Sequence, residues 1–254
     1  MLAQMNDTRP QSKTPMQPEL SAVKALSFDV FGTCVDFRAS IAREVRELAR
    51  AKGFRVNAAK FADAWRAGYR PAMDRVSRGE LPWTRIDALH RMILDAILEK
   101  FRITALTAEE KEHLNRAWHR LKPWPDTVRG LKRLKKRYII ATLSNGNTSL
   151  LVNMAKHAGL PWDCIFSAET FHHYKPDPET YLGAAELLDL KPGEVMMVAA
   201  HKHDLRAAAS HGLKTAFVRR PHEYGRNQGT DLEDDPAFTI NADDFNDLAD
   251  QLGC

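Results

Sequence analysis

The first candidate for chemistry in this 254-residue chain is an aspartate that ends a short apolar segment. Asp29 follows residues 23–28 and precedes Gly32 and Thr33, a pair typical of a turn. A carboxylate at the end of a buried strand can act as a covalent nucleophile. It can equally serve only to cap the turn, and Asp29 alone does not decide between the two roles.

Two further loops offer polar groups of other kinds. Ser144 and Asn145 follow the apolar residues 138–143, and their side chains can donate hydrogen bonds to an anion. The alternative is an ordinary Asn-Gly turn before a helix, which is the commoner use of such residues. Lys175 lies in residues 174–178 beside two prolines, where its ammonium group could lower the pKa of Asp29 and keep it ionised. A solvated surface lysine is the alternative.

The fourth polar stretch, residues 201–204, reads His-Lys-His-Asp. Two histidines two positions apart do not by themselves make a tetrahedral zinc site, so we expect no metal here. Asp204 could cap the start of a helix, or it could accept a hydrogen bond from Lys175 or from a water molecule.

The elements that must position these residues alternate between strand and helix patterns. Apolar segments typical of buried strands occur at residues 23–28, 138–143, 164–166, 195–200 and 214–218. Helical patterns separate them at residues 126–137, 147–158, 178–188 and 203–211. This alternation predicts a parallel sheet covered by helices on both faces. Ligands of such sheets bind beyond the carboxyl ends of the strands, where all four polar stretches lie.

Residues 38–121 interrupt the alternation with helical patterns alone, at residues 41–52, 58–69, 84–101 and 107–121. Thr107 and Glu110 match a capping box that starts the last of these helices. We interpret 38–121 as a helical cap domain inserted into a core domain of residues 22–37 and 122–254. The polar, proline- and glutamine-containing residues 1–21 are expected to form a disordered extension.

Composition excludes several classes of protein. Hydrophobic residues make up 44% of the chain and charged residues 28%, as in ordinary globular enzymes. No apolar run approaches the ~18 residues of a membrane span, and a spread-out net charge of +4 predicts no nucleic-acid partner. The three cysteines, Cys34, Cys164 and Cys254, are far apart and match neither a disulfide framework nor a zinc ribbon, so we expect a reducing, cytoplasmic location.

Taken together, the motifs occur in an order that resembles the haloacid dehalogenase superfamily. The matching residues are Asp29-x-x-x-Thr33, Ser144-Asn145, Lys175-Pro176-Asp177 and Asp204 after an apolar strand. The resemblance covers residues 22–254, and within the superfamily the chain is similar to the type II 2-haloacid dehalogenases. It implies an α/β fold with a Rossmann-like parallel-sheet core and an inserted helical cap domain.

Phe31 distinguishes two kinds of chemistry within this superfamily. The phosphatases generally carry a second aspartate two positions after the first, which serves as acid and base on the leaving alcohol. The chain has Phe31 there, and its apolar ring cannot transfer a proton. Halide needs no protonation as it leaves, and the dehalogenases that this sequence resembles have an aromatic residue at this position. Phe31 therefore favours carbon–halogen chemistry.

The resemblance implies a catalytic role for six residues. Asp29 attacks C2 of a short 2-haloalkanoic acid and releases halide, and water then hydrolyses the ester to a 2-hydroxy acid of inverted configuration. Lys175 and Asp204 orient the nucleophile and the water. Thr33 and Ser144 hold the Asp29 and substrate carboxylates, and Tyr181 hydrogen-bonds near the lysine. The expected substrates are chloroacetate, L-2-chloropropionate and, as an extension, fluoroacetate.

Substrate and halide binding is implied for four residues. Asn145 and Arg66 would face the leaving halide, and Phe31 and His201 would complete that side of the pocket. Arg66 could equally be a surface residue of a cap helix. The resemblance implies no cofactor, and although family members are often dimers, it leaves a homodimer open.

The last motif departs from better-known family members. Ala199 and His201 stand where those members have serine and asparagine, and His203 replaces an aromatic residue. The missing hydroxyl puts the contacts to water and carboxylate in doubt. We hypothesise that His201 narrows the halide pocket and favours small halides, including fluoride.

Two alternative functions remain at this point. One is a Mg²⁺-dependent small-molecule phosphatase that would use Asp29, Lys175 and Asp204. The other is a catalytically silent protein that binds a small acid or a protein partner. Phe31 argues against the first, and the complete set of polar residues argues against the second.

Overall fold

The computed structural model describes residues 18–254, and its centre is a six-stranded sheet. The strands are β1 (Ala25–Phe28), β4 (Ile139–Ser144), β5 (Cys164–Ser167), β6 (Val195–Ala199), β7 (Lys214–Val218) and β8 (Ile240–Ala242). They run parallel in the order β5-β4-β1-β6-β7-β8. This confirms the predicted parallel sheet. The chain builds outward from β1 on one side and then on the other, so the carboxyl end of β1 is the switch point where ligands bind.

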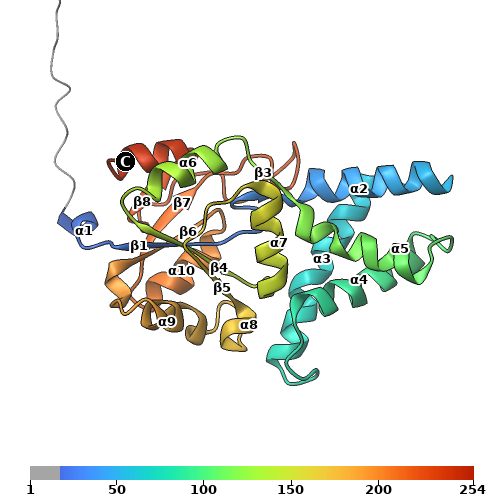
Figure 1. The fold of residues 1–254 in the computed structure, drawn as a ribbon, viewed down its shortest axis with the longest axis horizontal. Helices are drawn as coiled ribbons and strands as arrows, with labels where there is room; N and C mark the ends of the chain where they lie inside the picture. Colours follow the sequence, from blue (N-terminus) through green and yellow to red (C-terminus); the bar gives the residue numbers. More distant parts are fainter. Residues whose placement is uncertain (1–17) are drawn as a thin grey trace, which may run out of the picture.

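Helices cover both faces of the sheet (Figure 1). Successive strand residues face opposite sides, so Leu26 and Phe28 belong to one apolar cluster and Ala25 to a second. The first cluster includes side chains of α6 (Thr127–Leu134), α7 (Thr148–Ala158) and α11 (Phe245–Gln251). The second includes side chains of α9 (Pro178–Leu187) and α10 (Lys202–Ser210). The short helices α1 (Pro18–Ser21), α8 (Ala168–Phe171) and η2 (Pro192–Glu194) complete this part.

A block of helices projects from one end of the sheet (Figure 1). It comprises α2 (Phe37–Lys52), α3 (Ala58–Ser77), α4 (Ile86–Lys100), α5 (Ala108–Asn115) and η1 (Arg116–Arg120). The chain enters through β2 (Val35–Asp36) and returns through β3 (Lys122–Pro123), which pair antiparallel. The domain boundaries expected at 37/38 and 121/122 remain a prediction. Strands β2 and β3 lie next to these two positions in the sequence.

Several predicted elements differ in extent. Helix α3 continues past residue 69 to Ser77 although Pro71 removes one helical hydrogen bond, because Met73 beyond the proline is buried in the core. The helix predicted at residues 107–121 begins with the capping box of Thr107 and Glu110, but it ends at Asn115 and continues as a 3₁₀ turn. The edge strand β8 was not predicted, because it has only three residues and a polar one in its centre.

The predicted disordered extension at residues 1–21 lies mostly outside the described residues. Its last four residues, Pro18–Ser21, form α1. Across the described residues, no helix is long and apolar enough to cross a membrane.

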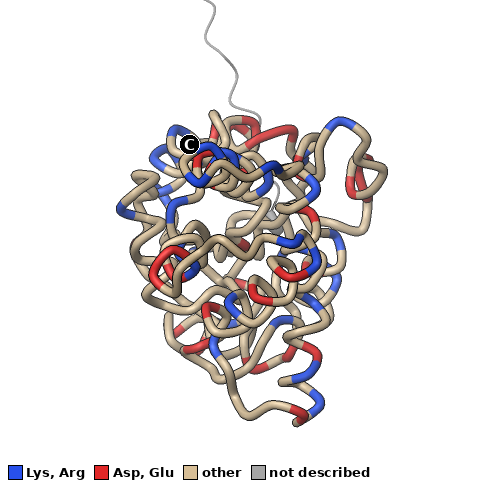
Figure 2. The backbone as a smooth tube through the Cα atoms, turned by 90° about the vertical axis from the view of Figure 1, so that its right-hand side faces the viewer, with Lys and Arg blue, Asp and Glu red and all other residues tan. Residues whose placement is uncertain are grey.

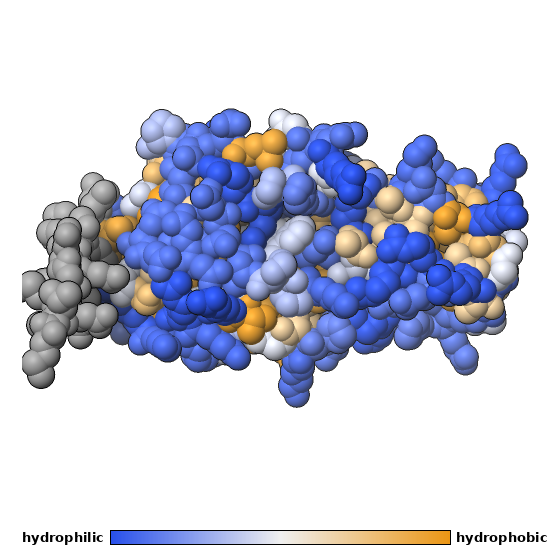
Figure 3. All heavy atoms as spheres, turned by 90° about the horizontal axis from the view of Figure 1, so that it is seen from above, coloured by the Kyte–Doolittle hydropathy of each residue, from blue (hydrophilic) through white to orange (hydrophobic). Residues whose placement is uncertain are grey.

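The surface is polar and mixed in charge. Basic and acidic residues alternate over the side that the helical block presents (Figure 2). Helices of this block also carry the i,i+4 ion pairs Arg70–Asp74 and Arg91–Asp95. Apolar areas on the face in Figure 3 are small and separate. On the side that Figure 2 shows, Lys and Arg are interspersed with Asp and Glu and form no one-signed stripe of the kind that a nucleic-acid interface would need.

Candidate active site

The carboxylate of Asp29 lies at the carboxyl end of β1, the central strand. Its backbone N–H donates to the carbonyl of Val198 at 3.0 Å, which ties it to the end of β6. Only 7% of the residue is exposed. Thr33 donates its hydroxyl to Asp29 Oδ2 at 2.8 Å, and that hydroxyl accepts from the Ala200 N–H at 2.9 Å. Because the hydroxyl accepts from Ala200 through a lone pair, its single proton is left to point at Asp29.

Lys175 joins the nucleophile to the last motif. Its Nζ lies 3.0 Å from Asp29 Oδ1 and 2.5 Å from Asp204 Oδ2. Tyr181 donates to the other oxygen of Asp204 at 2.6 Å. The lysine backbone is held from β4, because its N–H donates to Asn145 Oδ1 at 2.7 Å. Residues from the loops after β1, β4 and β5 and from helices α9 and α10 therefore converge on one buried ion-pair network.

This network sets the charge of the nucleophile. Burial would raise the pKa of Asp29, but the Lys175 ammonium and the hydrogen bond from His201 outweigh it and hold the pKa well below its ordinary value. Burial would likewise lower the pKa of Lys175, but the Asp204 and Asp29 carboxylates raise it. Asp29 is therefore an anion, and Lys175 a cation, across the physiological pH range.

His201 and Glu223 extend the network in a way that the sequence did not predict. His201 Nδ1 lies 3.1 Å from Asp29 Oδ2, and its Nε2 lies 2.9 Å from Glu223 Oε1. Burial would lower the pKa of His201, but Glu223 and Asp29 together raise it well above its ordinary value. Glu223 is only 2% exposed. A buried histidine suggests that a carboxylate lies beside it. The sequence around residue 223 is polar and gave no indication that Glu223 is that carboxylate.

Aromatic side chains form the wall opposite Asp29. The ring of Phe31 packs edge-on against Trp118 at 5.7 Å and against Tyr69 at 6.2 Å. The Arg66 guanidinium lies over Tyr69 at 4.4 Å and over Phe37 at 5.2 Å. One of its terminal nitrogens, Nη1, is buried and has no hydrogen-bond partner among residues 18–254. Burial raises the pKa of Tyr69 to about 12, so the phenol beside Arg66 stays neutral.

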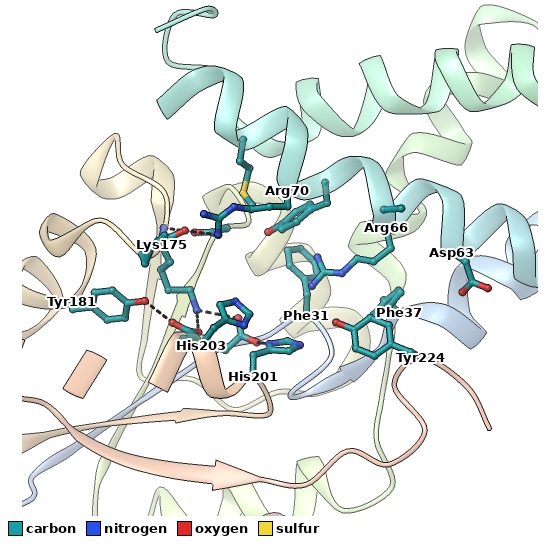
Figure 4. Close-up of a pocket in the computed structure, with 17 residues that line it drawn as sticks. Phe31, Phe37, Asp63, Arg66, Arg70, Lys175, Tyr181, His201, His203 and Tyr224 are labelled. Carbon is teal, nitrogen blue, oxygen red and sulfur yellow. Dashed lines mark hydrogen bonds and ion pairs between the residues drawn. The ribbon is translucent and has the colours of Figure 1, made fainter. Parts of the chain in front are cut away.

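Together these residues enclose a cavity of about 480 Å³. Figure 4 shows Lys175, Tyr181, His201 and His203 grouped on its sheet side, with Arg66 entering from the helical block. Asp63 also lines the cavity, but its carboxylate points away and pairs with Arg38.

The structure brings most of the predicted site residues together. The cavity is lined by Asp29, Phe31, Arg66, Asn145, Lys175, Tyr181, His201, His203 and Asp204. Thr33 is absent from the cavity lining but donates a hydrogen bond to the nucleophile directly. Ser144 does not line the cavity: it is 1% exposed, and its hydroxyl accepts from the Gly146 N–H at 3.2 Å. Phe37 and Tyr224 are lining residues that the sequence did not predict for this role, because they also fit ordinary apolar packing. Tyr69, which the sequence left open between a substrate wall and ordinary packing, also lines the cavity.

Within residues 18–254, one group of side chains could reach a common cation, namely His173, Asp177 and Glu179. These residues are at least partly exposed, unlike the buried Lys175 beside them, and Glu179 is classed as exposed. In the cavity itself, Lys175 occupies the space between the carboxylates of Asp29 and Asp204.

Comparisons with known proteins agree with this geometry. The chain matches the haloacid dehalogenase-like hydrolases over residues 23–212, and it therefore belongs to that family. Within the family its similarity is to the L-2-haloacid dehalogenases. It is 49% identical to a defluorinating L-2-haloacid dehalogenase of known structure, with a TM-score of 0.89 over 91% of this chain and 96% of that one.

Two further relatives extend the same similarity. A second L-2-haloacid dehalogenase structure is 48% identical, with a TM-score of 0.88 over 91% of this chain and 99% of that one. The (S)-2-haloacid dehalogenase 1 of Pseudomonas sp. strain CBS-3 is 28% identical over 239 residues, 87% of this chain and 98% of the relative.

Proposed function

We propose that the protein hydrolyses short L-2-haloalkanoic acids to 2-hydroxy acids through a covalent ester on Asp29. One observation carries the proposal: Asp29 is a buried carboxylate at the switch point of the sheet, kept ionised by Lys175 and faced by the apolar ring of Phe31. Such a site supplies a nucleophile but no proton donor two residues further on. That combination suits a leaving group which departs as a stable anion.

The first half of the reaction is an in-line displacement. An oxygen of Asp29 forms a bond to C2 of the substrate, and the carbon–halogen bond breaks with its electron pair on the halide. This inverts the configuration at C2. Arg66 lines the cavity, and its buried Nη1 is a donor without a partner among the described residues, so an anion in contact with this guanidinium would be favoured. Arg66, with Asn145 nearby, is therefore our proposed site for the departing halide.

The second half is hydrolysis of the ester. Water adds to the Asp29 carbonyl carbon, and its oxygen stays on the protein while the former Asp29 oxygen leaves in the hydroxy acid. We assign the orientation of this water to Lys175 and Asp204, which line the cavity and are held by Asn145 and Tyr181. Thr33 orients Asp29, whereas Ser144 acts through the loop that it stabilises at Gly146.

The helical block would serve as the cap of this site. It contributes Arg66 and Tyr69 from α3, and its Trp118 supports Phe31 from behind. Apolar walls would restrict the access of bulk water and would strengthen the ionic contacts inside.

Halide release from chloroacetate, fluoroacetate and L-2-chloropropionate tests the proposal, with and without EDTA and with Asp29→Asn as the control. We expect release that survives EDTA and is lost in the variant. Mg²⁺-dependent release of phosphate from a generic ester, without halide release, would instead identify a phosphatase. No activity in either assay would favour a binding protein.

We further propose a cytoplasmic location and leave a homodimer as a question for light scattering. Cys34, Cys164 and Cys254 are all free thiols, which supports a reducing compartment.

A further inference from the structure

The two oxygens of Asp29 have different surroundings. Oδ2 accepts from the Thr33 hydroxyl at 2.8 Å and contacts His201 Nδ1 at 3.1 Å. Oδ1 contacts only Lys175 among the described residues, at 3.0 Å. A carboxylate oxygen has about two lone-pair sites. Both sites are used on Oδ2, but one is free on Oδ1, so Oδ1 is the oxygen that can attack the substrate.

This assignment fixes the role of Oδ2 in the ester. If Oδ1 carries the substrate, Oδ2 becomes the carbonyl oxygen. When water adds to the carbonyl carbon, negative charge develops on Oδ2. Its two contacts, Thr33 and His201, are already in place, which is the arrangement of an oxyanion hole.

His201 can donate to this oxygen only with a proton on Nδ1. Its Nε2 lies 2.9 Å from Glu223 Oε1. A neutral imidazole whose single proton is on Nε2, hydrogen-bonded to Glu223, would therefore point the lone pair of Nδ1 at Asp29. The doubly protonated ring avoids that repulsion and satisfies both carboxylates. The His203 ring, 5.7 Å away, and the Tyr224 phenol also face His201, and neither supplies a negative charge at neutral pH.

Glu223 is held in place from the turn that carries Thr33. Arg220, three residues earlier, donates from Nε to the Thr33 carbonyl at 2.8 Å and pairs through both terminal nitrogens with Asp126 at 2.8 and 2.9 Å. The loop after β7 is therefore docked on the nucleophile turn, and the Glu223 carboxyl reaches His201 from it.

We propose that Glu223 and His201 act as a pair in ester hydrolysis: Glu223 keeps His201 charged, and His201 and Thr33 bind the oxyanion on Asp29 Oδ2. This inference rests on the proposed function. His201 touches the reacting group, whereas Glu223 is a positioning residue that acts through it.

The bonds and protons balance as follows. Water oxygen bonds to Asp29 Cγ, the carbonyl electron pair moves to Oδ2, and Asp204 takes one water proton. The pair then returns from Oδ2, the Cγ–Oδ1 bond breaks, and the alkoxide of the hydroxy acid takes the proton from Asp204. The second water proton remains on Asp29 and passes to solvent when the carboxylate re-ionises.

Rapid-quench kinetics on Glu223→Gln and His201→Ala separate the two halves of the reaction, with Glu233→Gln as a matched exposed control on the same loop. We expect first-turnover halide release to fall less than ester hydrolysis in either variant, because Lys175 still contacts Asp29. Ester hydrolysis should fall about tenfold in Glu223→Gln and about 10²-fold in His201→Ala, as for loss of one oxyanion donor. The Asp29 ester should then accumulate and appear as a mass increase of the intact protein.

The pH dependence of ester hydrolysis gives a readout that a merely structural role would not move. With one flanking carboxylate fewer, His201 in Glu223→Gln should lose its proton at a lower pH than in the wild type. The rate should therefore fall with rising pH earlier in the variant, and Glu223→Asp should move the fall back upward.

Two results would overturn the pair. One is an equal loss of halide release and hydrolysis with no ester on Asp29. The other is a hydrolysis rate that rises with pH in Glu223→Gln, which would make His201 a base. In both cases wild-type halide release would still uphold the proposed function, whereas its absence would reject that function itself.

Discussion

The carboxyl group of Glu223 lies directly over Gly32. A Cβ built on Gly32 would stand 2.0 Å from Glu223 Oε1 and 2.5 Å from its Cδ, closer than atoms can approach. Gly32 also has φ +85°, a backbone conformation that residues other than glycine rarely adopt. The turn after the nucleophile is thus shaped by a residue almost two hundred positions later.

Gly32→Ala should disturb both the turn and Glu223. We expect a loss of stability of about 1–3 kcal/mol from the left-handed backbone, measured by urea unfolding. Because the new methyl group displaces the carboxyl from His201, ester hydrolysis should slow more than halide release. Gly229→Ala is the matched control, since nothing lies within 4 Å of its Cβ position on the same loop. Equal behaviour of the two variants would contradict the prediction.

Lys175→Met should remove the charge that keeps Asp29 ionised. Asp29 and Asp204 would then share a buried site without their common cation, so the pKa of Asp29 should rise. The acid limb of first-turnover halide release should shift to higher pH, and stability should fall by about 3 kcal/mol. Rapid quench across pH measures the shift, with the exposed Lys156→Met as the control. An unchanged acid limb would show that another group sets the charge of Asp29.

His90→Phe should make the protein more resistant to acid. His90 is fully buried and stacks on Trp118 at 4.2 Å, and neither of its ring nitrogens has a hydrogen-bond partner within the described part of the chain. Burial lowers its pKa from 6.5 to about 3. The unfolded chain therefore binds a proton that the folded chain refuses, and stability falls by about 1.4 kcal/mol per pH unit as pH drops from about 6 toward 3.

Phenylalanine preserves the ring stack and removes this titration. The difference in unfolding free energy between His90→Phe and the wild type should grow as pH falls from 7 to 4. The exposed His157→Phe should show no such growth. A difference that stays constant with pH would mean that His90 is charged in the fold.

His201→Asn tests the hypothesis on halide size. The smaller side chain should widen the pocket beside Asp29, so the rate ratio of fluoroacetate to chloroacetate should fall. Both ring nitrogens of His201 contact carboxyl groups, so it would act on the halide by occupying space rather than by a hydrogen bond. A ratio that does not fall would reject the hypothesis.

Residues at strand ends were predictable because their position follows from the sheet itself. Asp29, Lys175 and Asp204 follow apolar segments, and parallel strands bring their carboxyl ends to one edge. Tyr181 was identified through the resemblance, which implied a tyrosine that forms a hydrogen bond near the lysine. In the structure its hydroxyl donates to Asp204, the carboxylate that pairs with Lys175.

Glu223 and Ser144 mark where such reasoning ends. Glu223 lies in a polar loop whose path depends on the Arg220–Asp126 ion pair, a contact across 94 positions with no local pattern. Ser144 occupies the expected place after β4, but the hydroxyl turns to the Gly146 N–H instead of the cavity, a choice of rotamer that a motif does not specify.

The aromatic wall behind Phe31 has a consequence for unfolding. Phe31 belongs to the nucleophile turn, and Trp118 and Trp65 belong to the helical block, yet all three lie in one apolar cluster with Leu26 and Phe28 of the central strand. Detaching the helices would open this cluster to water. Heat should therefore melt sheet and helices in a single cooperative transition, with equal calorimetric and van't Hoff enthalpies.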